Sequence, residues 1–203
     1  MSPQTLSDKV LSRIYGKKRG WVFTPVHFLD LGSDSSVRKT LQGLCDRGVI
    51  NRIARGLYTY PRIHPQLGML TPAPDQIALA LAGKDDLRIQ PSGAYAANIL
   101  GLSAQVPARI VFLTDGTNRK IKVGRQEIIL KRTTAKNMAT AGRTSGLVIQ
   151  ALRHLGKEHV DDKTVEILAG RLSPEDRRQL IKDIRHAPAW IGEIFRRLAE
   201  RDD

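Results

Sequence analysis

One stretch of the sequence changes its periodicity in the middle, and this change constrains the fold more than any other feature. The stretch SSVRKTLQGLCDRGVINRIARGLYTY covers residues 35–60. After Gly48, a residue type common just beyond helix C-termini, an alternating pattern begins, and it turns near Gly56. The stretch therefore predicts an amphipathic helix followed directly by a two-stranded hairpin. The core-facing residues of that helix recur at spacings i, i+4, i+7 and i+8: Val37, Leu41, Leu44 and Cys45.

The preceding residues complete a familiar order of elements. Residues 3–15 have helical apolar spacing, and residues 21–24 form a short extended run. Residues 25–32 begin with proline and end with glycine, as a short helix does, and the Ser33–Asp34 pair can cap the next helix. The order helix, strand, helix, helix, hairpin is that of a winged helix-turn-helix domain, which we expect over residues 1–62.

The rest of the chain predicts a second domain. Residues 61–74 contain four prolines and one glycine, so we expect a connector and domain boundary at residues 63–74. Residues 75–203 combine helical segments with a strand in ARIVFLTDG and a hairpin in KIKVGRQEIILKRT, and they end in helices. The predicted fold class is α+β: an N-terminal winged helix-turn-helix, then a small α+β domain with a helical C-terminal tail.

The positive charge is concentrated in the first three quarters of the chain. The whole sequence carries a formal net charge of +13. Residues 1–62 contribute +7 and residues 63–150 contribute +6, whereas residues 151–203 hold equal numbers of basic and acidic residues. A basic excess attracts phosphate groups in a salt-dependent way, so nucleic acid is the partner class that this distribution favours.

The outward residues of the predicted helix and hairpin are the candidates for DNA contact. Small, polar and cationic side chains near a helix N-terminus suit a helix that enters the major groove, and basic residues near a hairpin tip suit a wing that touches the backbone. Gly43 suggests a close approach by another backbone to this helix. The candidates are Ser35, Ser36, Arg38, Lys39 and Gln42 on the helix, Arg52 and Arg55 on the wing, and Lys17, Lys18 and Arg19 as further backbone contacts.

The run FLDLGSDSSVRKTLQGLCDRGVINRIARGLYTYP resembles the N-terminal winged-helix domain of AbiEi-family antitoxins, the antitoxin half of type IV toxin–antitoxin systems. The shared features are a Gly-Ser helix start at residues 32–33, the spaced apolar helix, the break at Gly48, and an Arg-Gly-Leu-Tyr wing at residues 55–58 followed by Pro61. The resemblance continues through AANILGLSAQVPARIVFLTDGTNRKIKVG, residues 96–124, and the APAWIGEI helix.

The resemblance implies a bipartite antitoxin and transcriptional autorepressor. Its N-terminal domain would bind repeats in its own promoter, as double-stranded DNA. Its C-terminal domain would oppose a toxin of nucleotidyltransferase type. The residues themselves leave two alternatives open: another winged-helix transcriptional regulator, or a protein-interaction module that does not bind DNA.

A second basic group lies in the region of residues 109–143. Three roles remain open for it: an extension of the DNA footprint, a contact with an acidic toxin or with tRNA bound by that toxin, or a solvated sheet face without a partner. Few aromatic residues lie among these cations, which argues against a stacking platform for single-stranded nucleic acid. The residues are Arg109, Arg119, Lys120, Lys122, Arg125, Lys131, Arg132, Lys136 and Arg143.

The sequence offers no catalytic constellation, so we expect a protein that is not an enzyme and needs no cofactor or metal. His154 and His159 are five residues apart, which does not place them on one helical face, and no phosphate-binding glycine motif is present. Cys45 is the single cysteine and lies on the apolar side of its helix. With no signal-peptide pattern at the start and no apolar run near 20 residues, we expect a cytoplasmic bacterial protein.

Overall fold

The structure is a computed structural model that describes residues 4–83 and 87–200. It has the mixed α+β architecture predicted from the sequence. The chain divides into two compact units, Met1–Leu87 with Ile121–Arg125, and Arg88–Lys120 with Gln126–Asp203. The connector expected at residues 63–74 lies inside the first unit, because this segment forms strands and leads into a helix that packs on that unit.

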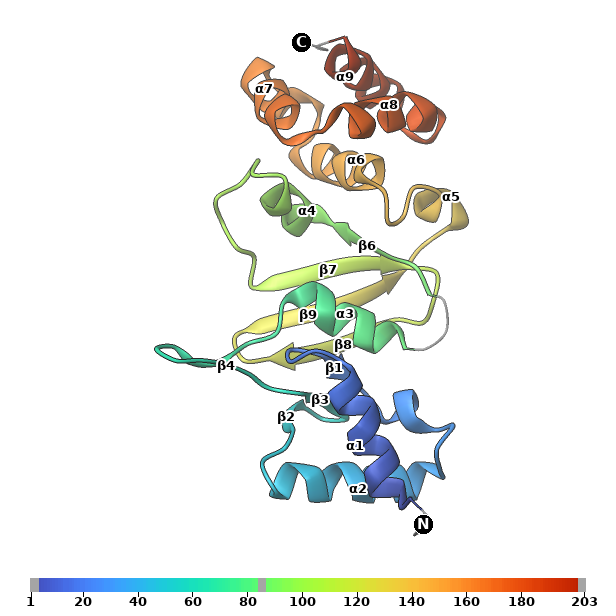
Figure 1. Cartoon of the computed structure of the whole chain (residues 1–203). Helices are drawn as coiled ribbons and strands as arrows, with labels where there is room; N and C mark the ends of the chain where they lie inside the picture. The colour runs from blue at the N-terminus through green and yellow to red at the C-terminus, as the bar shows by residue number, and fades with distance from the viewer. Residues whose placement is uncertain (1–3, 84–86, 201–203) are drawn as a thin grey trace. The chain divides into compact units, whose positions relative to one another are not determined.

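The first unit begins with the order of elements that defines a winged helix (Figure 1). Its three short strands form one antiparallel sheet in the order β1-β3-β2. One element of this order differs from the prediction. The second helix, expected over residues 25–32, is a 3-10 helix of only four residues, Pro25–Phe28. The elements are α1 (Leu6–Gly16), β1 (Val22–Phe23), η1 (Pro25–Phe28), α2 (Asp34–Asp46), β2 (Asn51–Ala54) and β3 (Leu57–Thr59).

Helix α2 forms for the reasons that its sequence suggests. The Ser33 hydroxyl caps the helix by accepting a hydrogen bond from the Ser36 amide at 3.3 Å. Gly48 follows the helix with φ of 70°, a left-handed conformation that glycine adopts without steric cost. Val37, Leu41 and Leu44 are completely buried, and each contributes roughly 1.5–3 kcal/mol of hydrophobic stabilisation relative to an exposed position.

The buried side of α2 packs into the core of the first unit. Helix α1 contributes Val10 and Ile14, and an aromatic cluster from β1 and η1 completes the core. The rings of Phe23 and Phe28 meet edge to face at 5.4 Å, and Trp21 lies 4.6 Å from Phe23. Helix α2 is therefore held on its inner side by a well-packed core, and its outer side is left to solvent.

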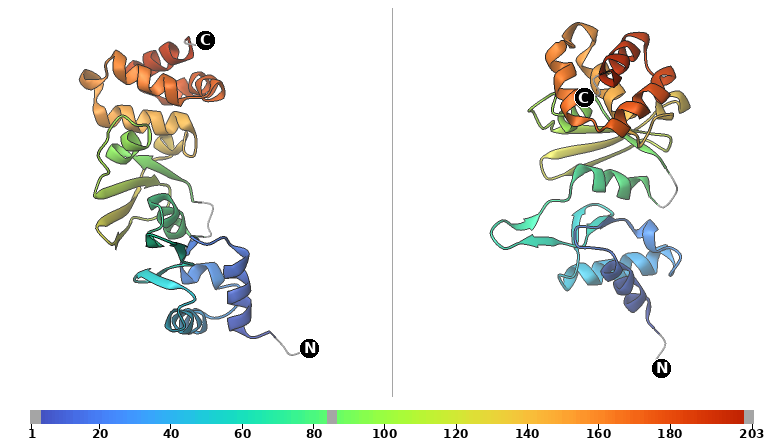
Figure 2. Two further views of the ribbon diagram at one scale, coloured as in Figure 1. Left: turned by 60° about the vertical axis from the view of Figure 1, so that its left-hand side comes forward. Right: turned by 45° about the horizontal axis from the view of Figure 1, so that its top comes forward.

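The segment after β3 forms a hairpin that projects from the rest of the first unit (Figures 1 and 2). Its strands are β4 (Arg62–His64) and β5 (Gly68–Leu70), which make a separate two-stranded sheet. Ile63, Leu67 and Met69 are 64%, 73% and 56% exposed, so this hairpin carries a concentration of exposed apolar side chains. Helix α3 (Pro74–Ala82) follows and packs against β1.

The second unit contains most of a four-stranded sheet in the order β6-β7-β9-β8. Strand β6 pairs antiparallel with β7, and β7 pairs in parallel with β9. The predicted hairpin is confirmed as β8 and β9, which are neighbours in the sheet. The strands are β6 (Ile89–Ser92), β7 (Arg109–Thr114), β8 (Arg119–Val123) and β9 (Gln126–Arg132).

The helices of the second unit form successive layers beyond the sheet (Figure 1). Helices α4 and α6 pack together next to β6, and the last three α-helices lie beyond α6. Their core includes Leu152, Leu168, Leu180, Ile191 and Phe195. The elements are α4 (Gly93–Ile99), α5 (Ala135–Met138), α6 (Thr144–Leu155), η2 (Lys157–His159), α7 (Asp162–Arg171), α8 (Pro174–Asp183), η3 (Ile184–His186) and α9 (Ala189–Ala199).

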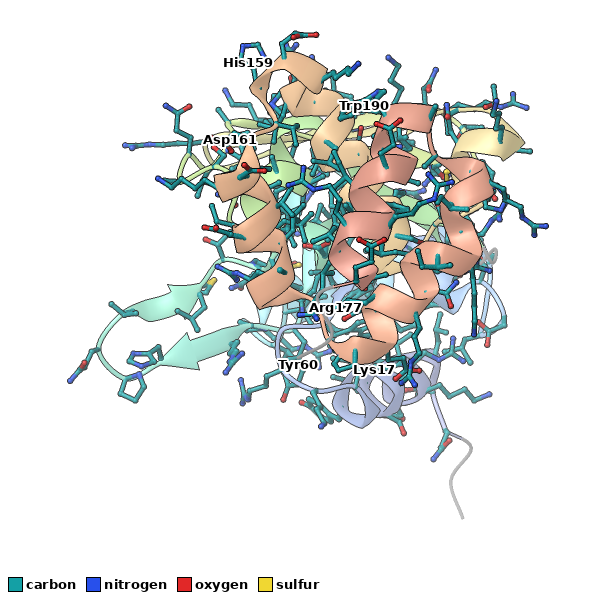
Figure 3. The ribbon with its side chains drawn as sticks, turned by 90° about the horizontal axis from the view of Figure 1, so that it is seen from above. Lys17, Tyr60, His159, Asp161, Arg177 and Trp190 are labelled. Atoms are coloured by element: carbon teal, nitrogen blue, oxygen red, sulfur yellow. The ribbon has the colours of Figure 1, made fainter. Side chains whose placement is uncertain are left out.

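Polar contacts join these helices to one another. Asp183, at the end of α8 and only 3% exposed, accepts hydrogen bonds from Arg143, Ser145 and Gln179. The Arg177 side chain extends from α8 towards α7, and its Nη2 atom donates to the Ala169 carbonyl at 3.0 Å (Figure 3). These contacts fix the packing of the C-terminal helices.

Candidate nucleic-acid interface

The five candidates on α2 all lie on its exposed side. Ser35, Ser36, Arg38, Lys39 and Gln42 are exposed, whereas the residues between them at helical spacing are buried. The two faces of the helix thus have different roles. One face stabilises the fold, and the opposite face presents hydroxyl, amide and cationic groups to solvent. The folded core requires none of these five side chains.

Two of the candidates already have acidic partners on the same helix. The Arg38 Nε atom lies 2.7 Å from Oδ2 of Asp34, and the hydrogen bond to this carboxylate raises the pKa of the Arg38 guanidinium. The Gln42 Nε2 atom donates to Oδ1 of Asp46 at 2.8 Å. Lys39 has no carboxylate partner within residues 4–83 and 87–200. Lys39 is therefore a solvated cation, and Arg38 is held in place by an exposed ion pair.

The serines lie where the helix begins. The Ser33 hydroxyl donates to Oγ of Ser36 at 2.9 Å and lies 3.2 Å from Oγ of Ser35. The N-terminus of an α-helix carries a partial positive charge and favours anions. Hydroxyl groups at this position can contact both phosphate oxygens and base edges.

The β2–β3 hairpin has the form of a wing. Gly56 occupies its tip with φ of 71°, and Arg52 and Arg55 are both exposed. The register of the two strands shifts between Arg52 and Ala54, which explains why the alternation in the sequence slips at this point. The hairpin therefore carries two exposed guanidinium groups, one of them next to its tip.

The structure does not bring Lys17, Lys18 and Arg19 to the outward face of α2. The start of α1 packs against α2: Leu6 lies beside Gly32, just before α2, and Arg47 Nη2, just after α2, donates to the Ser7 hydroxyl at 3.3 Å. The end of α1 is about 15 Å further along its axis, because the helix rises 1.5 Å per residue. Lys17, Lys18 and Arg19 follow that far end.

Two of these three cations are instead held over aromatic rings of their own unit. The Arg19 guanidinium carbon lies 4.9 Å from the centroid of the Tyr60 ring, and Nη1 donates to the Pro61 carbonyl at 3.1 Å. The Lys17 ammonium lies 5.9 Å from the Trp21 ring centroid. Lys18 is exposed. The sequence did not reveal these cation–ring contacts, because Tyr60 is far from Arg19 along the chain.

The predicted close approach of a backbone to Gly43 is wrong. A Cβ atom built on Gly43 would meet no atom of another residue within 4 Å, apart from the neighbours that helix geometry fixes. The Arg47 Nε atom donates to the Gly43 carbonyl at 3.2 Å, which is a contact within the helix terminus. Packing of the first unit therefore does not explain the glycine.

Part of the basic group at residues 109–143 is neutralised within the sheet. Glu127 forms ion pairs with Lys120 at 2.6 Å and with Arg109 at 3.0 Å. The hydrogen bond from Lys120, supported by its charge and by Arg109, lowers the pKa of the Glu127 carboxyl. Arg143 is bound to Asp183 at 2.7 Å and has a structural role. The cations of this group thus do not all remain available for a partner.

Other kinds of site have little support in the described residues. These residues contain no cluster of three metal-ligating side chains. Burial raises the pKa of the Cys45 thiol, which disfavours the reactive thiolate form. No helix in the described part of the chain combines the length and apolarity needed to cross a membrane. The exposed face of α2 and the wing are therefore the strongest candidate site in the first unit.

Comparison with known proteins places the chain in a family. No curated protein matches it. Among solved structures, it is similar to the RV2827C protein from Mycobacterium tuberculosis, with a TM-score of 0.46 and 14% sequence identity over 98% of this chain and 78% of that chain. The sequence model of a family of unknown function, DUF6088, matches residues 9–180. Because the match spans most of the sequence, the chain belongs to the DUF6088 family.

Proposed function

We propose that the protein binds double-stranded DNA sequence-specifically through α2 and the β2–β3 wing. One observation carries this proposal: α2 is buried along one side and presents Ser35, Ser36, Arg38, Lys39 and Gln42 along the other. A helix with polar and cationic residues on its free side suits the major groove, where base edges display distinct donors and acceptors.

The residues divide naturally between positioning and sequence readout. Lys39 and Arg55 are exposed cations suited to phosphate contacts, which set affinity and make it salt-dependent. Ser35, Ser36 and Gln42 have hydrogen-bonding groups of the kind that read base edges. Arg38 can exchange the Asp34 carboxylate for a phosphate oxygen, since an exposed ion pair contributes little stability.

We further propose that the bound DNA is the protein's own promoter and that the protein is an AbiEi-like antitoxin. The support is the sequence resemblance at residues 28–61 and 96–124. In this proposal the second unit opposes a nucleotidyltransferase-like toxin, and repression of the operon places the protein in the cytoplasm. A toxin gene of that type next to this gene is the expected genomic arrangement.

The direct test measures binding to the DNA upstream of the gene. Fluorescence anisotropy should detect binding of the full chain to this DNA, with at least about tenfold lower affinity for a scrambled duplex of equal length. The affinity should fall steeply as salt increases. Equal affinity for both duplexes at every salt concentration would reject sequence-specific binding.

A second candidate function is a protein-interaction module that does not bind DNA. The β4–β5 hairpin supports this alternative, because Ile63, Leu67 and Met69 are exposed apolar residues of a kind found at protein interfaces. A chain that showed no salt-dependent affinity for any duplex, but whose hairpin residues were protected from hydrogen exchange by a partner protein, would fit this function.

A further inference from the structure

The first unit contains a cleft that the proposed DNA contact does not use. It has a volume of about 540 Å³ and is lined by residues of α1, β1, η1 and α3. Small-molecule sites usually measure about 300–1,000 Å³ and combine an apolar wall with a few polar groups. The cleft therefore has the size of a ligand site.

One wall of the cleft is apolar and is held in place by packing. Trp21 and Val22 come from the β1 region, and Leu79 and Ala80 come from α3. The Trp21 ring is fixed by Phe23 at 4.6 Å and meets the His27 ring edge to face at 5.7 Å. Leu79 is 56% exposed, although α3 is otherwise largely buried. This wall suits the apolar body of a ligand, and the Trp21 ring favours a planar one.

Among the described residues that line the cleft, Lys17 is the cation available to a ligand. Arg13 is already neutralised, because its two terminal nitrogens contact the two Asp30 carboxylate oxygens at 2.7 and 2.6 Å. Lys17 has no carboxylate partner in the described part of the chain, and no acidic residue lines the cleft there. Its ammonium lies 5.9 Å from the Trp21 ring, at the end of α1 (Figure 3).

We propose that this cleft binds a small planar aromatic carboxylate. The ring of the ligand lies against Trp21 and Leu79, and its carboxylate accepts a charge-assisted hydrogen bond from Lys17. Gln76 and His27 add polar groups at the cleft lining. This assignment gives Lys17 a role at a site away from the outward face of α2.

The two tryptophans allow a direct test of binding. Trp21 lines the cleft, and Trp190, the other tryptophan of the chain, lies in the second unit, on α9. The indole N–H signals of both residues are followed in a ¹⁵N-correlated NMR spectrum of the full chain during titration with 1-naphthoate, and the Trp190→Phe spectrum assigns them. The Trp21 signal should move and saturate while the Trp190 signal stays in place. Absence of a saturable Trp21 shift, or equal shifts of both signals, would overturn the proposal.

The charge contribution is tested with matched variants and a neutral ligand. Lys17→Gln should raise the Kd for 1-naphthoate about tenfold, the effect expected for loss of a charge-assisted hydrogen bond. It should leave the weaker binding of 1-naphthalenemethanol unchanged. Lys18→Gln, at the exposed neighbouring position, is the control and should bind as the unchanged protein does. An unaltered Kd for 1-naphthoate in Lys17→Gln would contradict the assigned role of Lys17.

A second variant places a negative charge in the cleft. Leu79→Glu occupies an exposed helical position, so the fold should be retained and the melting temperature should stay close to that of the unchanged protein. The new carboxylate should abolish the 1-naphthoate shift at Trp21, and persistence of the shift would contradict the proposed location. These measurements contain no DNA, so their failure would leave the DNA-binding proposal standing.

Discussion

The Nε atom of Arg38 lies 2.7 Å from Oδ2 of Asp34, one turn earlier on the outward side of α2. The two side chains are 56% and 55% exposed, so their pairing contributes at most about 1 kcal/mol to stability. The pair holds the guanidinium near the helix N-terminus, where anions are favoured. A phosphate oxygen can therefore replace the Asp34 carboxylate at little cost to the fold.

Asp34→Asn should strengthen DNA binding. The change removes a negative charge from the proposed DNA-facing surface and releases Arg38, so affinity for a random duplex should increase and the salt dependence should steepen. The protein should lose less than about 1 kcal/mol of stability, because a first-turn acid and an i,i+4 pair are removed. Anisotropy titrations test this, with Glu175→Gln in the first turn of α8 as the charge-matched control. Weaker binding by Asp34→Asn would contradict a DNA contact at this helix end.

Arg55→Ala should weaken binding to all duplexes by a similar factor. The residue lies next to the wing tip at Gly56 and is assigned a phosphate contact, which carries no base information. The slope of log affinity against log salt should become less steep by about one unit. If titrations showed a loss confined to the cognate duplex, Arg55 would instead contact a base.

Asp183→Ala should strongly destabilise the second unit. Burial opposes ionisation, but hydrogen bonds from Ser145 and Gln179, with the charge of Arg143, lower the pKa of the Asp183 carboxyl overall. Asp183 is buried but Arg143 is 49% exposed, so the loss is mainly that of the buried hydrogen bonds, roughly 1–3 kcal/mol for each partner left unsatisfied. Denaturant unfolding measures the loss, and Asp162→Ala is the control, because Asp162 is 82% exposed and its removal should barely change the melting temperature.

The pH dependence of stability follows from the same lowered pKa of Asp183. The unfolded state binds protons at this carboxyl more readily than the folded state does, so the stabilisation is complete above the unfolded pKa and is lost as pH falls through the folded pKa. The stability difference between the unchanged protein and Asp183→Asn should therefore shrink on acidification. A difference that grew with falling pH would contradict the ionised state of Asp183.

Two glycine substitutions in helices should have opposite effects on stability. Gly43→Ala should raise the free energy of unfolding by about 1 kcal/mol, since the added Cβ meets nothing and alanine is the better helix former. Gly146→Ala should lower it by about 1–3 kcal/mol. In α6 the added Cβ would clash with the Thr140 carbonyl oxygen and lie 2.7 Å from Gln90 Oε1. Destabilisation by Gly43→Ala would indicate a contact that the folded chain does not show.

The sequence predicted the elements whose cause is local. The α2 helix, its Ser33 cap and its end before Gly48 follow from residues within about 15 positions, and the structure confirms all three. Spacing also separated the buried side of α2 from its exposed side, so the five helix candidates were correctly predicted to be exposed.

Two kinds of feature were missed: a local hairpin whose turn residues resemble a connector, and contacts that depend on distant residues. The short strands β4 and β5 were interpreted as a connector, because Pro65 and Gly68 dominate the pattern, whereas Gly68 adopts φ of 68° next to the hairpin turn. The sequence pattern predicts individual strands but does not show which strands pair, so the parallel pairing of β7 with β9 was not predicted. The position of Arg19 over the Tyr60 ring likewise follows from tertiary packing.

The central claim is tested most directly by removing two cations from α2 and two from elsewhere. Arg38→Ala with Lys39→Ala is compared with Arg178→Ala and Lys182→Ala, exposed residues on α8. Both double variants lose the same charge and should keep the melting temperature of the unchanged protein. Anisotropy at moderate salt should show that the α2 variant loses binding to the upstream DNA, whereas the α8 variant retains it. Equal binding by the two variants would contradict α2 as the recognition helix.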